Sequence, residues 1–213
     1  MNDRYHDWLR HVFDHEVKDR RWYFEEDAQE FAASSAEIVE LLGRTFYAAG
    51  KDLTSFSDAQ VDQGLWYLAG DSEYLRELTV ASVSMHKRLT AIEGIYHLYA
   101  DCFAKRCAEM LGHLSEEGPP LNSICYMFWD TCQLTWGFDD REEEIKVAIF
   151  RVIEKTLGIE HRACREGALH GLGEVAHANP QRVRAIIDGF LAKTTLDEKL
   201  LAYALEAREG RVQ

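Results

Sequence analysis

The sequence has few of the residues that interrupt helices and none of the long apolar runs that cross membranes. Its 213 residues include only three prolines. No run of about 18 apolar residues occurs, so we expect no transmembrane helix. The charged first residues fit no secretory signal peptide. Alternation typical of strands is scarce, whereas apolar residues recur mostly at helical spacing, which predicts an all-α protein that does not enter a membrane.

Cysteine is also sparse, and its arrangement argues against a disulfide framework. The five cysteines form no Cys-x-x-Cys pair, and their number is odd. Disulfide-based scaffolds are shorter and richer in cysteine. We therefore expect free and mostly buried thiols in a reducing, cytoplasmic compartment.

Known catalytic motifs are missing. The chain has no phosphate-binding glycine loop, no His-Glu-x-x-His, no Gly-x-Ser-x-Gly and no EF-hand pattern. Gly171 and Gly173 lie inside an expected helix and are followed by Glu174, so they are interpreted as a packing feature. We expect no cofactor, and a non-enzymatic role is favoured over an enzyme.

Negative charge dominates the composition. The formal net charge is −13, with 46% hydrophobic and 29% charged residues. Residues 160–213 contain eight basic and eight acidic residues, so all the excess acid lies upstream. Such a chain repels phosphate backbones, and nucleic acid is not an expected partner. An acidic surface favours solubility and would suit a basic protein partner.

Start and stop signals divide the chain into roughly ten helices. Ser34 with Glu37, Ser57 with Gln60, and Asn179-Pro180 have the spacing of helix N-termini. One long helix is expected from about 85 to 114, and the last helix is expected to begin near Thr195. No linker separates two halves, so we expect one all-α domain. It is divided into an N-terminal arm (1–33), a helical body (34–138) and a region of helical repeats (139–209).

The segment from Glu160 to Lys193 is the most informative, because it predicts two helices joined by an Asn-Pro turn. Small and apolar residues occupy positions where the two helices would cross: Ala163, Cys164, Ala168, Leu169, Gly171, Leu172, Gly173, Val175, Pro180, Val183, Ile186, Ile187, Phe190 and Leu191. From Glu142 to Arg208 the chain thus resembles HEAT-like or armadillo-type repeats. The resemblance implies an α-solenoid-like stack of helical hairpins whose concave surface binds proteins. For residues 34–134, an irregular helical bundle fits almost as well.

One helix face carries the only plausible metal ligands. At 100° per residue, Glu166, His170, Glu174 and His177 fall within an arc of about 80° on the helix expected over 160–177. Two imidazoles and two carboxylates can bind a divalent metal. The competing interpretation is a solvated face with Glu–His pairs.

Three aromatic residues are candidate anchors for a partner. Trp66, Tyr67 and Trp136 lie at expected helix ends or away from the main apolar stripe. The sequence therefore favours a cytoplasmic protein-protein interaction module. The alternative is a metal-binding helical protein or enzyme that uses the Glu/His face. The oligomeric state stays open, because the apolar last helix would also suit a dimer.

Overall fold

The computed structural model describes residues 2–212 and confirms the all-α fold. Within these residues the chain forms eleven α-helices and no strand. The helices are α1 (Asn2–Phe13), α2 (Ser35–Tyr47), α3 (Ala49–Asp52), α4 (Asp58–Trp66), α5 (Met85–His97), α6 (Ala104–Arg106), α7 (Pro120–Thr131), α8 (Glu143–Leu157), α9 (Arg162–Glu174), α10 (Pro180–Leu191) and α11 (Glu198–Arg208). Two π-helical segments extend α4 and α5, and four short 3₁₀ segments lie in the connections.

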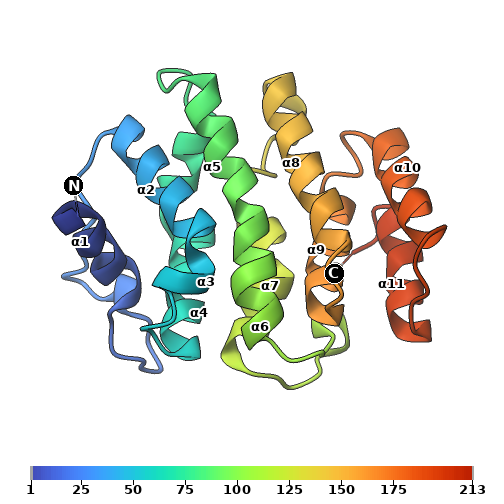
Figure 1. Ribbon diagram of the computed structural model, residues 1–213, viewed down its shortest axis with the longest axis horizontal. Helices are drawn as coiled ribbons and strands as arrows, with labels where there is room; N and C mark the ends of the chain where they lie inside the picture. The colour runs from blue at the N-terminus through green and yellow to red at the C-terminus, as the bar shows by residue number, and fades with distance from the viewer. Residues whose placement is uncertain (1, 213) are drawn as a thin grey trace.

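The helices stack in two layers. One layer contains α2, α5 and α8 in succession, and the other contains α4, α7, α9 and α11. Helix α8 packs against α9 across the layers, whereas α10 contacts α9 and α11. Figure 1 shows the helices following one another along the long axis, with α1 at one end and α10 and α11 at the other. This is an arrangement of stacked helical pairs, while membership of a repeat family stays a prediction.

Helix caps form at the positions that the spacing predicts. The Ser34 hydroxyl accepts a hydrogen bond from the Glu37 amide at 3.3 Å. Ser57 and Gln60 form a reciprocal capping box, with bonds of 3.2 and 3.1 Å. The Asn179 side chain caps α10, in which proline takes the first turn. These caps satisfy amide groups that have no partner within the helix.

The long helix ends earlier than expected. Helix α5 continues through a π-helical segment into α6 and stops at Arg106, after which Cys107 is extended. The Asn122 side chain bonds both the amide and the carbonyl of Ala108, at 2.9 and 2.8 Å. Further on, the Gly112 amide donates to a carboxylate on α9. The expected helix over 107–114 is therefore wrong, because tertiary hydrogen bonds replace helical ones there.

The last helix also begins later than expected, at Glu198 instead of near Thr195. The Asp197 carboxylate accepts bonds from the amides of Lys199 and Leu200 and caps the helix. Buried residues from Tyr5 to Ala207 form one hydrophobic cluster along the stack.

Two glycines bring α7 and α9 into close contact. A Cβ atom on Gly167 would lie 2.3 Å from the carbonyl oxygen of Cys125. On Gly171 it would lie 2.6 Å from the Trp129 ring. Both distances are far below van der Waals contact, so only glycine allows this separation between the two helices.

Replacing one of these glycines should force α7 and α9 apart. We expect Gly167→Ala to lower the free energy of unfolding by at least about 2 kcal/mol, since the new methyl meets backbone. Gly189 on α10 is the matched control, because a Cβ there meets nothing within 4 Å. Gly189→Ala should stabilise the protein by about 0.5–1 kcal/mol through helix propensity. Urea unfolding of both variants checks this, and equal effects would contradict it.

An aromatic cluster attaches the N-terminal arm. Trp22 is buried and stacks on His15, with ring centroids 3.8 Å apart, and it meets the edge of Tyr67 at 4.6 Å. His11 lies among the same rings, 5.5 Å from Trp22 and 5.4 Å from Phe31. Burial, and then the nearby His15, lower the pKa of His11 to about 4.

Acid should weaken the attachment of the arm. The unfolded chain binds a proton at His11 near pH 6.5, whereas the folded protein binds it only near pH 4. The stabilisation is therefore present above pH 6.5 and is lost as the pH falls towards 4. Relative to His11→Phe, wild type should lose roughly 1–3 kcal/mol of unfolding free energy between pH 7 and 4, at about 1.4 kcal/mol per pKa unit. Urea unfolding across this range measures it, and a constant difference between the two proteins would refute it.

Candidate functional site

Helix α9 is enclosed along most of its length, so its polar face is not a solvated one. Helices α7, α8 and α11 all pack against it. Glu166 and His170 are only 1% and 2% exposed. Glu174 is half-buried, and His177 lies exposed beyond the end of the helix. The four predicted metal ligands therefore occupy three different environments.

Glu166 is a structural carboxylate. Its two oxygens accept bonds from the amides of Gly112 and His113, at 2.8 and 3.0 Å. The His113 imidazole adds a third bond through Nδ1 at 2.5 Å, and its ring stacks on Tyr203 at 4.2 Å. Glu166 thus anchors the turn at Gly112 to α9, and both of its carboxylate oxygens are occupied by donors from that turn.

His170 is buried with one nitrogen bonded and the other without a partner. Its Nδ1 lies 2.6 Å from the hydroxyl of Tyr203 on α11. The Tyr203 hydroxyl lies 3.1 Å from that of Tyr126, so the imidazole is part of a chain of hydroxyl groups. Nε2 has no hydrogen-bond partner. Burial, and then the nearby His113, lower the pKa of His170 to about 4, which keeps the imidazole neutral at pH 7.

Asp130, at the end of α7, joins His170 and Glu174 in one cluster. Each offers one ligand atom, and these three atoms lie within 4.8 Å of one another. His170 Nε2 is 3.9 Å from Glu174 Oε1. Burial raises the pKa of both carboxyl groups, and Asp130 raises that of Glu174 further. In the part of the chain that the structure describes, no other group of three His, Cys, Asp or Glu side chains has its ligand atoms this close together.

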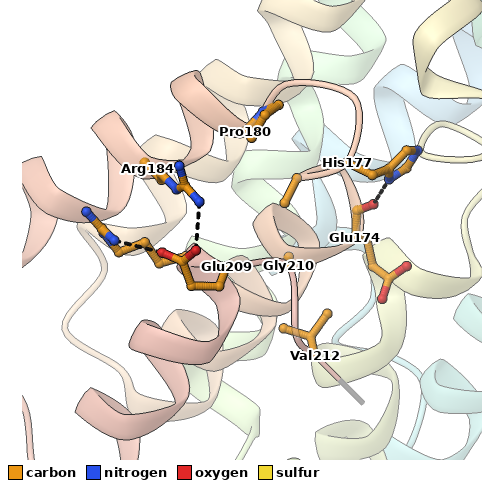
Figure 2. A pocket seen from close by; sticks show the side chains of 10 residues that line it. Glu174, His177, Pro180, Arg184, Glu209, Gly210 and Val212 are labelled. Atoms are coloured by element: carbon orange, nitrogen blue, oxygen red, sulfur yellow. Dashed lines mark hydrogen bonds and ion pairs between the residues drawn. The ribbon is translucent and has the colours of Figure 1, made fainter.

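His177 does not join the cluster, because α9 ends before it. Val175 leaves helical geometry at the end of α9, so the spacing of 100° per residue no longer applies. The His177 Nδ1 bonds the carbonyl oxygen of Glu174 at 2.9 Å, and Nε2 lies 3.8 Å from Asp139 Oδ2. Figure 2 shows the Glu174 carboxylate directed away from the His177 ring.

A groove of about 440 Å³ borders the cluster between the end of α9 and the residues after α11. Glu174, His177 and Pro180 line one side, and Glu209 and Val212 the other (Figure 2). Its two arginines are paired, because Glu209 contacts Arg184 at 2.7 Å and Arg208 at 2.8 Å. Neither arginine of the groove is therefore free to bind an anionic ligand.

The three aromatic anchor candidates differ in exposure. Tyr67 is buried within the N-terminal aromatic cluster, so its ring is not available to a partner. Trp66 is half-buried, with the Arg21 guanidinium 5.0 Å from its ring centroid. Trp136 is 52% exposed, and its Nε1 donates to the Asp130 carbonyl oxygen at 3.0 Å. Of the three, Trp136 presents an open ring in a fixed orientation.

The cysteines are free, and most are enclosed. Four of the five are buried, and only Cys107 is partly exposed. Contact with the Cys125 thiol and with His161 lowers the pKa of Cys164. His161 Nε2 in turn lies 3.1 Å from the Cys107 carbonyl oxygen. The sequence prediction of buried core thiols is confirmed, while the proximity of His161 to Cys164 was not anticipated despite their spacing of three residues.

Comparisons of this chain with protein-family models, with curated proteins and with solved structures found no match.

Removing the charge of Glu166 should destabilise the fold. We expect Glu166→Gln to lower the unfolding free energy by about 1–3 kcal/mol, because a buried acceptor of three bonds is replaced by a group that can accept fewer. Glu154 on α8 is exposed, and Glu154→Gln should change it by less than about 0.5 kcal/mol. Urea unfolding at pH 7 compares the two, and similar effects would exclude a structural role for Glu166.

Proposed function

We propose that this protein is a helical interaction module that binds a basic protein partner through the groove between α5 and α8. The observation that carries the proposal is the composition of this groove, which has a volume of about 450 Å³. Its floor is apolar, with Leu89 from α5 and Val147 from α8. Its rim is acidic, with Glu93, Glu143 and Glu144.

The acidic rim is only partly neutralised. Arg151 pairs with Glu93 across the groove at 2.5 Å. Among the residues that the structure describes, neither Glu143 nor Glu144 takes part in an ion pair, and both are exposed. Two carboxylates at the mouth of an apolar groove suit a lysine or arginine, whose aliphatic stem packs on the floor while its charge meets the rim.

Trp136 supports the same proposal. It lies in the loop that leads into α8, next to the exposed acidic residues Asp139 and Asp140. The Arg141 guanidinium bonds the carbonyl oxygens of Gln133 and Trp136, at 2.6 and 2.7 Å, which holds this loop. An exposed tryptophan that is already ordered loses little entropy on binding and can also receive a cation on its face. The resemblance to HEAT-like repeats adds an analogy of architecture only.

Charge reversal at the rim tests the proposal. A pull-down from native lysate with wild type should recover a basic protein, and Glu143→Lys with Glu144→Lys should reduce its recovery at least about tenfold, since like charges would oppose it. Glu154→Lys is the matched control, because it reverses an exposed charge on the same helix outside the groove. Its recovery should stay near that of wild type.

Two outcomes would contradict the proposal. One is the absence of any reproducible partner at low salt, where a charged interface is strongest. The other is a partner that the double variant retains as well as wild type.

A further inference from the structure

The environment of His170 is that of a metal ligand whose orientation is already fixed. Its imidazole is 2% exposed, and the bond to Tyr203 at 2.6 Å holds Nδ1. When Nδ1 carries the proton, it donates to Tyr203, and Nε2 presents its lone pair towards Asp130 and Glu174. Metal-binding histidines commonly use their second nitrogen in this way.

The unpartnered Nε2 is the second, independent feature of this site. A buried polar atom without a hydrogen bond costs free energy. Here that atom lies beside two carboxylates that are themselves partly buried, and Glu174 Oε1 is 3.9 Å away. At that separation the pair is longer than a hydrogen bond. The three groups thus lie close together, but neither carboxylate forms a hydrogen bond with Nε2 of His170.

The two carboxylates of the cluster, Asp130 and Glu174, also favour binding of a cation. Within residues 2–212, Asp130 takes part in no ion pair, and the one side chain within ion-pair distance of the Glu174 carboxylate is His170, at 3.9 Å. Two carboxylates within 4.8 Å of each other repel when both are ionised. A bound divalent cation would remove the repulsion and occupy the lone pair of His170 at the same time.

We propose that Asp130, His170 and Glu174 bind one divalent transition-metal ion of the zinc or manganese class. One imidazole and two carboxylates match the ligands of these ions, whereas calcium and magnesium prefer oxygen alone. Ligand atoms around a single zinc ion lie about 3–3.5 Å apart, given bonds of about 2.0–2.1 Å. Asp130 and Glu174 are only partly buried, so rotation of their side chains is the change that metal binding would require.

The site lies between the ends of α7 and α9, beside the groove at the end of α9. Glu174 lines the groove at the end of α9, so a metal bound here would keep coordination positions on that side for water. The Trp136 side chain bonds the backbone of Asp130 at 3.0 Å, which places its exposed ring beside the same helix end.

Metal titration of the purified full-length chain tests this proposal. After treatment with EDTA, Zn²⁺ should bind with one equivalent per chain and a Kd of about 10 µM or tighter by calorimetry at pH 7.5. Asp130→Asn and His170→Asn should each weaken binding at least about tenfold, because each removes a ligand. Tyr203→Phe should also weaken it, by about tenfold, since it removes the bond that orients His170.

His177→Asn is the matched control. His177 is on the same segment, is exposed and lies outside the cluster, so its variant should bind Zn²⁺ within about twofold of wild type. Should His170→Asn fail to fold by circular dichroism, the partly exposed Asp130→Asn still decides the matter. Co²⁺ substitution adds a spectroscopic check, because imidazole and carboxylate ligands give only visible bands.

Three results would overturn the proposal. The first is no heat of binding with Zn²⁺ or Mn²⁺ at millimolar concentration. The second is an affinity that Asp130→Asn leaves unchanged or that His177→Asn lowers equally. The third is an intense near-ultraviolet thiolate band with Co²⁺, which would place the metal on the cysteines instead.

Discussion

The distance between α7 and α9 is the constraint on which the rest of the structure depends. At Gly167 and Gly171 a single added carbon would overlap with the facing helix, at 2.3 Å from the Cys125 carbonyl oxygen and 2.6 Å from the Trp129 ring. Because these positions lack side chains, the backbone of one helix rests on the other. This contact sets the position of Asp130, on α7, relative to His170 and Glu174 on α9.

Several polar groups between these closely packed helices are held in networks of hydrogen bonds. Glu166 accepts three hydrogen bonds, and the chain from His170 through Tyr203 to Tyr126 links α9, α11 and α7. In a low-dielectric interior, satisfied networks specify one arrangement, while a group without a partner is costly. In the series of side chains from His170 to Tyr126, Nε2 of His170 is a buried atom without a hydrogen-bond partner. This atom lies beside two carboxylates, and that position is the basis of the metal site proposed above.

The sequence predicts what depends on neighbours in the chain. Helical spacing and the caps at Ser34, Ser57 and Asn179 follow from local geometry, and the structure confirms them. The interpretation of Gly171 as a packing residue also holds. A small residue on a helix predicts that another element packs closely there, but it does not identify that element.

What could not be predicted depends on contacts between distant segments. Asp130 lies 40 positions before His170, and nothing in its own sequence context distinguishes it from other acidic residues. The helical wheel grouped Glu166 with Glu174 but could not show that a turn 54 residues away would take Glu166 as its anchor. It also could not show where α9 stops, and that end point separates His177 from the cluster. Periodicity therefore identified the helix that carries two of the three cluster residues. The third, Asp130, is brought to them by the packing of α7 on α9.

The five cysteines differ in solvent exposure, and this difference allows one of them to be labelled selectively with a spectroscopic probe. Cys107 alone is partly exposed, at the point where the chain leaves α6 and turns towards α7, while the other four sulfurs are buried. A maleimide probe would react there first, without any cysteine having to be replaced. A fluorophore at that place would lie beside the segment whose backbone α9 anchors, so its emission would report opening of the stack before the helices themselves unfold.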